Sequence, residues 1–121
     1  MHISNYSTTT SVASAGSNTI AGWLRGHGIP LEGIDESAEA GATAALQAAA
    51  HALSGIATTA LTHADAAKWA PAHSALSSLV SELQGLGSAG AAAGHPTLGP
   101  VIDNICGILT SEMGEIQSGL A

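Results

Sequence analysis

The strongest constraint on the fold of this 121-residue chain is a run of apolar residues spaced alternately three and four positions apart. The run consists of Trp69, Ala72, Leu76, Leu79, Leu83 and Leu86. This spacing places all six side chains on one stripe of an α-helix, and it is typical of a helix that packs against other helices. The sequence therefore predicts a helix over about 65–86 in a helical bundle.

Three further helices are predicted over about 12–25, 36–62 and 99–120. The helix over 99–120 has the widest apolar stripe, formed by Val101, Ile102, Ile105, Ile108, Leu109, Met113, Ile116 and Leu120. No segment shows the alternating pattern of a strand. We therefore expect an all-α fold: a compact four-helix bundle forming a single domain over 12–121, with glycine-rich loops. Residues 1–11 are rich in Ser and Thr and are expected to form a flexible N-terminal arm.

The composition indicates a modest hydrophobic core. The chain is rich in alanine, has 15 glycines and lacks phenylalanine. Small side chains let helices approach closely, but each one buries little apolar area and contributes little to stability. We expect a fold that is marginal as a monomer or is completed by a partner.

The charge balance argues against two classes of partner. Only Arg25 and Lys68 are basic against nine acidic residues, which gives a formal net charge of −7 at pH 7. Binding to nucleic acid requires several cationic side chains to neutralise phosphates, and docking on anionic lipid has the same requirement. The sequence thus predicts no nucleic-acid partner.

The sequence also predicts neither a membrane span nor a signal peptide. The longest stretch without charged side chains, residues 40–64, is mostly Ala, Thr and Gly and is less apolar than a spanning helix. The N-terminus has no basic segment followed by an apolar one. We expect cytoplasmic synthesis without a cleaved signal, and export or incorporation into a particle stays open.

Two kinds of motif that carry chemistry in other proteins have simpler interpretations in this chain. Residues 85–90 match the pattern Gly-x-Gly-x-x-Gly, but a helix precedes them where a nucleotide-binding unit needs a strand. We interpret them as a link between two helices. The carboxylate pair Glu36 and Glu39 is expected at a helix N-terminus, and the pair Glu112 and Glu115 on a solvated face. No catalytic residue is predicted, and the protein is not expected to be an enzyme.

Metal and cofactor sites are not predicted either. The six histidines are His2, His27, His51, His63, His73 and His95, and none has another ligand at helical spacing. Isolated histidines are the favoured interpretation, with a pH-sensitive cluster or a metal site as weaker alternatives. Cys106 is the only cysteine and stands among isoleucines. The favoured interpretation of Cys106 is a small buried hydrophobe. A reactive thiol and a disulfide to a second chain are weaker alternatives.

The favoured function is a structural or assembly protein that acts through helix–helix contacts, either self-associating or docking onto a larger particle. The partner would be another protein or further copies of the chain. Trp23 and Trp69 are interpreted as core residues first and as interface anchors second. The candidate interface residues are Trp23, Trp69, Leu76, Leu83, Ile105 and Ile116.

Two alternative functions are kept. A small, alanine-rich, tryptophan-containing helical chain without a signal peptide resembles, in composition, the type VII secretion substrates of the WXG100 class. That resemblance implies an exported effector or partner-binding protein. In residues 23–26 Trp and Gly stand one position further apart than in the family's motif. The family's C-terminal export signal, which contains a tyrosine, is missing, because the only tyrosine is Tyr6. The second alternative is a bundle that binds a small ligand or acts on membranes.

Overall fold

The computed structural model describes residues 6–29, 31, 36–54, 56 and 66–120. Within these ranges the chain forms five α-helices and no strand, which confirms the all-α class. The helices are α1 (Ser7–Ala13), α2 (Ile20–Gly26), α3 (Glu36–Ser54), α4 (Ala66–Ala92) and α5 (Leu98–Leu120). The end of the helix predicted over 36–62 falls partly on residues 57–62, which lie outside the described ranges.

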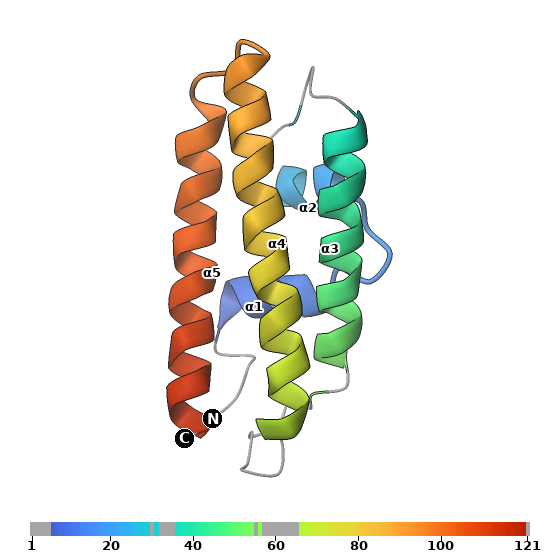
Figure 1. The fold of residues 1–121 in the computed structure, drawn as a ribbon, viewed down its shortest axis with the longest axis vertical. Coiled ribbons are helices and arrows are strands. Elements are labelled where there is room, and N and C mark those ends of the chain that lie inside the picture. Colours follow the sequence, from blue (N-terminus) through green and yellow to red (C-terminus); the bar gives the residue numbers. More distant parts are fainter. Residues whose placement is uncertain (1–5, 30, 32–35, 55, 57–65, 121) are drawn as a thin grey trace.

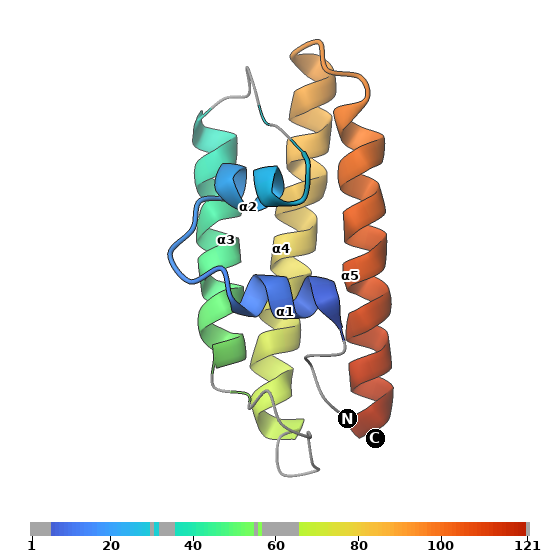
Figure 2. The same ribbon diagram turned by 180° about the vertical axis from the view of Figure 1, so that it is seen from behind.

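Three long helices form a layer in the order α3, α4, α5. α4 packs against both neighbours, and successive helices run antiparallel (Figure 1). The short helices α1 and α2 cross one side of this layer (Figure 2). α1 contacts both α3 and α5, and α2 contacts α3. The core lies between the layer and these two crossing helices.

The apolar stripes fill this core. All six members of the predicted α4 stripe are buried. The inner face of α5 contributes Ile102, Ile105, Leu109, Met113 and Ile116. Val101 and Ile108 were expected in the same stripe, but both side chains are exposed. The α5 prediction was too wide because α5 lies at the edge of the layer, where the described helices leave part of its surface exposed.

The N-terminal prediction was wrong in two respects. The helix expected over 12–25 is two helices, because the chain turns at Gly16, whose positive φ of 57° is a conformation that favours glycine. The Thr19 side chain then accepts a hydrogen bond from the Gly22 amide and caps α2. The expected arm over 1–11 is helical from Ser7 onward and contains the buried residue Thr9. Residues 1–5 lie outside the described ranges.

The glycine-rich link predicted over 85–90 is also wrong, because α4 continues through it to Ala92. The reason is close packing against α5. A Cβ on Gly87 would lie 3.1 Å from the Gly99 Cα, and one on Gly90 would overlap the Leu98 side chain. These glycines let the two helices approach near their connection. They lie within a helix, so the context of a nucleotide-binding loop is absent.

Candidate functional site

The structure places all six candidate interface residues inside the bundle. Their exposed fractions run from 0% to 6% for Trp23, Trp69, Leu76, Leu83, Ile105 and Ile116. A side chain this deeply buried cannot contact a partner while the bundle keeps this conformation. A surface that meets another protein must therefore be formed by other residues.

Both tryptophans also have polar partners within the chain. The Trp69 indole N–H donates to the Gln117 side-chain oxygen over 2.6 Å and so joins the start of α4 to the end of α5. The Trp23 indole N–H donates to the Ser11 hydroxyl over 3.0 Å and joins α2 to α1. These contacts assign both residues to the packing of the helices.

The outer side of α5 carries the most distinctive exposed surface of the described residues. Val101 and Ile108 are the exposed large hydrophobic side chains found there, at 44% and 45% exposure. They stand seven residues apart and therefore lie on one stripe of the helix. We call the set Val101, Asn104, Ile108, Ser111 and Glu115 the α5 outer stripe. All five side chains are exposed.

Among the described elements, none packs over this stripe of α5. α5 packs against α4 on one side and against α1, and its outer side forms the edge of the layer in both views (Figures 1 and 2). A shallow depression of about 440 Å³ lies beside the stripe, over Gly107. A Cβ on Gly107 would meet nothing within 4 Å, so another backbone or side chain can approach closely here.

Acidic groups surround this depression. Asp103, Glu112 and Glu115 all line it. Glu112 has a second role, because its carboxylate accepts hydrogen bonds from the Thr8 and Thr9 amides and from the Thr9 hydroxyl. It therefore caps the N-terminus of α1 from α5, and was wrongly assigned to a solvated face. The position of Glu115, which is exposed, agrees with that assignment.

Cys106 lies on the inner side of α5 with only 3% of its surface exposed. Burial, together with the charge of Asp103, raises the pKa of its thiol from 9.0 to about 11. The thiol approaches the Val80 carbonyl oxygen at 3.9 Å. Such a protonated, buried thiol is a poor nucleophile, which agrees with its interpretation as a small hydrophobe.

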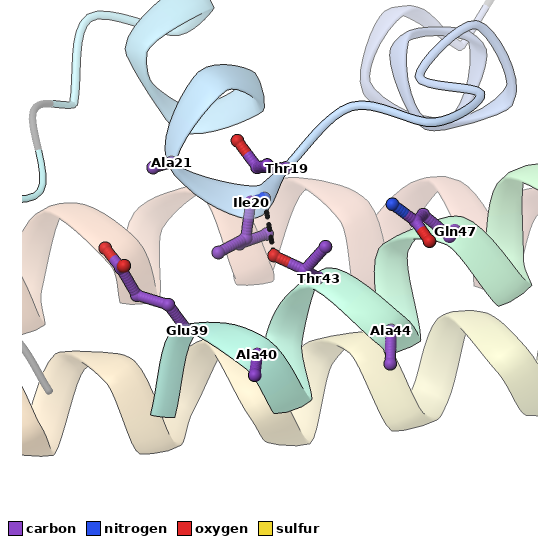
Figure 3. A pocket seen from close by; sticks show the side chains of 8 residues that line it. All are labelled: Thr19, Ile20, Ala21, Glu39, Ala40, Thr43, Ala44 and Gln47. Atoms are coloured by element: carbon purple, nitrogen blue, oxygen red, sulfur yellow. Dashed lines mark hydrogen bonds between the residues drawn. The ribbon is translucent and has the colours of Figure 1, made fainter. Parts of the chain in front are cut away.

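A second depression, of about 460 Å³, lies between α2 and α3 (Figure 3). Two of its polar side chains, Thr43 and Gln47, attach α3 to α2 and to the residues just before α2. The Thr43 hydroxyl accepts a hydrogen bond from the Ile20 amide over 2.9 Å. The Gln47 side-chain amide donates to the carbonyl oxygens of Ser17 and Asn18. We assign this groove to the attachment of α2 to the layer.

The fold brings Ser11 and His27 together, which no spacing in the sequence indicated. The Ser11 hydroxyl lies 2.9 Å from the His27 Nε2, and the His27 ring packs on Trp23 with centroids 4.6 Å apart. A catalytic triad also needs an acidic group that orients the histidine. Among the residues that the structure describes, no carboxylate contacts His27. The contacts of Ser11 with Trp23 and His27 link α1 to α2 and to its C-cap residue.

The other predicted sites give few contacts. His73 packs edge-on against Trp69, and His51 is exposed. His2 and His63 lie outside the described residues. Within the described ranges, no three His, Cys, Asp or Glu residues lie close enough together to hold a metal ion. In the same ranges, no helix combines the length and apolarity that crossing a bilayer requires.

Comparisons of the chain with family models, curated proteins and solved structures gave no match. The candidate site therefore rests on the geometry of α5. The sequence held one signal for the α5 outer stripe: Val101, Ile108 and Glu115 follow one another at intervals of seven. The sequence prediction placed Val101 and Ile108 in the same stripe as the core residues of α5, because spacing alone does not show which side of a helix its neighbours cover.

Proposed function

We propose that the protein is a non-enzymatic assembly protein that docks onto another protein through the α5 outer stripe. The observation that carries this proposal is the pair Val101 and Ile108, both exposed on one stripe of α5 that the other described helices leave uncovered. Apolar residues at an interval of seven are the pattern with which one helix packs along another. Docking would remove both side chains from water and cover the depression over Gly107.

The charge of the stripe favours a different protein over a second copy of this chain. Pairing two copies through α5 would bring together two surfaces that both carry Asp103 and Glu115 and that offer these carboxylates no basic side chain of α5. Neither of the two basic residues lies on α5, since Arg25 belongs to α2 and Lys68 to α4. Like charges brought together at an interface weaken association. The favoured mode is therefore docking onto a larger assembly.

Site-specific photo-crosslinking in the source cells tests this proposal. A photo-reactive residue replaces Asn104, on the stripe, and in a matched control it replaces Ser78, which is exposed on α4. We expect one discrete protein adduct from position 104 and none of that mass from position 78. The adduct should disappear when Ile108→Ser is added, because this change removes the apolar contact at an exposed position.

Each of the following results would refute the proposal. The first is the same set of adducts from both positions. The second is an adduct at position 104 that survives Ile108→Ser. The third is the absence of any adduct at position 104. An adduct with twice the mass of the chain would identify a second copy as the occupant and would overturn docking onto another protein.

A further inference from the structure

We infer that the surface which docks on the α5 outer stripe is a basic amphipathic helix, with apolar residues seven positions apart and an Arg or Lys next in the same register. This inference rests on the proposed docking function and adds the chemistry of the partner. It follows from the order of residues along the stripe and from the charges beside it.

The stripe has an apolar part and an acidic end. Val101 and Ile108 are followed, at the next interval of seven, by Glu115. Each residue advances a helix by about 1.5 Å, so the three positions are spaced roughly 10 Å apart along the axis. A helix lying along α5 meets two apolar positions and then a carboxylate. The complementary order is apolar, apolar and basic at the same spacing.

The charges around the stripe all have one sign. Asp103 and Glu112 line the depression together with Glu115, and the described part of α5 contains no Lys or Arg. The Glu112 carboxylate is occupied by the backbone amides of α1, whereas Asp103 and Glu115 are exposed. These two carboxylates are open to cations that a partner brings. Opposite charge would both steer the approach and fix the register of the two helices.

Between Asp103 and Glu115, several residues of this surface are small and uncharged. Asn104 and Ser111 lie on the stripe and Gly107 beside it, and all three are exposed. A partner helix can approach closely at Gly107 because no side chain stands there. Close approach brings the long side chains of Arg or Lys alongside α5, where their stems can cover Ile108 while the charged ends reach Glu115.

Three matched peptides test this inference with the full chain. The first repeats Arg, Leu, Leu and Arg at intervals of seven in a helix-forming background, so that either helix direction presents the required order. The second has Glu in place of Arg, and the third has Ser in place of Leu. Binding is measured by fluorescence anisotropy of the labelled peptide at about 20 mM and about 500 mM salt.

We expect the Arg–Leu peptide to bind, with affinity at least about tenfold higher than either matched peptide. High salt should weaken the binding, because it screens exposed charges. The double variant Asp103→Asn and Glu115→Gln should weaken it by roughly threefold to tenfold, in keeping with two exposed ion pairs. Ser78→Ala, a change on α4, should leave the affinity unchanged.

The outcomes separate the inference from the function on which it rests. Equal binding of the Arg and Glu peptides, both weakened by Ile108→Ser, would overturn the basic partner and keep the docking surface. Binding that depends on charge but is unaffected by Ile108→Ser would overturn the docking function. No binding of the Arg–Leu peptide up to about 1 mM at low salt would overturn the basic helix alone, since the crosslinking result stands independently.

Discussion

Replacing Glu112 with alanine should detach α1 from the layer without disturbing the three long helices. The helix α1 has seven residues, and its N-cap residue, Tyr6, provides no side-chain hydrogen bond. The Glu112 carboxylate supplies what is missing. Its oxygens lie 3.3 Å from the Thr8 amide nitrogen, 2.9 Å from the Thr9 amide nitrogen and 2.9 Å from the Thr9 hydroxyl. These contacts join segments more than 100 positions apart in the sequence.

The magnitude follows from the groups that lose their partner. Loss of a helix N-cap costs about 0.5–2 kcal/mol, and a hydrogen bond to a charged group contributes about 1.5–3 kcal/mol. Thr9 is fully buried, so water cannot readily replace the lost acceptor at its amide and hydroxyl. We expect Glu112→Ala to lower the free energy of unfolding by about 2–3 kcal/mol. In a domain of this size that corresponds to a fall in Tm of roughly 10 °C.

Urea denaturation, followed by circular dichroism, measures this loss, and amide hydrogen exchange locates it. Protection should fall in α1 before it falls in α4. Glu112→Gln keeps one acceptor oxygen and should lose about half as much stability as Glu112→Ala. Glu115→Ala is the matched control, one turn further along α5 and exposed, and it should change stability by less than about 0.5 kcal/mol.

A double-mutant cycle tests the contact itself. Thr9→Val removes the hydroxyl and keeps the shape of the side chain, so its effect should depend on whether Glu112 is present. Equal losses for Glu112→Ala and Glu115→Ala would refute the capping argument. So would a loss in Glu112→Ala that leaves hydrogen exchange in α1 unchanged.

Four further predictions concern residues of α4 and α5. Gly90→Ala should destabilise by about 1–3 kcal/mol in urea denaturation because its Cβ would overlap Leu98, whereas Gly85→Ala, which meets nothing within 4 Å, should stabilise by up to about 1 kcal/mol. Cys106 should react with a thiol reagent at pH 8 about 100-fold more slowly in the folded chain than in urea, because its pKa of about 11 keeps it protonated. The folded thiol also holds its proton to higher pH than the unfolded one, so stability should fall as the pH rises from 9 to 11. Trp69→Phe should cost about 2 kcal/mol through the lost hydrogen bond and the smaller ring, measured by denaturation followed at far-ultraviolet wavelengths.

The parts of the fold that could be predicted depend on local spacing. The inner residues of α4 repeat every three or four positions, and any partner on that side buries them all. The break at Gly16 could not be placed in the same way, because glycine is tolerated in helices and also permits a turn. The glycines of residues 85–90, in contrast, do not interrupt the helix. There the chain stays helical, since Gly87 and Gly90 pack against the start of α5.

The contacts that could not be predicted join distant segments. Nothing near Glu112 in the sequence indicates that the N-terminus of a helix lies opposite it. Glu112 and Glu115 form a carboxylate pair of the kind that solvated helices often carry. The fold separates their roles, because α1 crosses α5 at one of them only. The same is true of Trp69 and Gln117, which meet across 48 positions.

The two sides of α5 therefore differ in exposure, and the candidate interface residues Ile105 and Ile116 both lie on its buried side. Large apolar side chains such as Trp69 and Ile116 are the first to be buried when a core has little apolar area. What remains for a partner is the less apolar side, where Val101 and Ile108 alternate with small polar residues and end at Glu115. Surfaces of this kind bind through charge and register as much as through apolar area. Changes at Ile108 and Glu115 should for that reason alter docking while leaving the stability of the bundle almost unchanged, and changes at Glu112 should do the reverse.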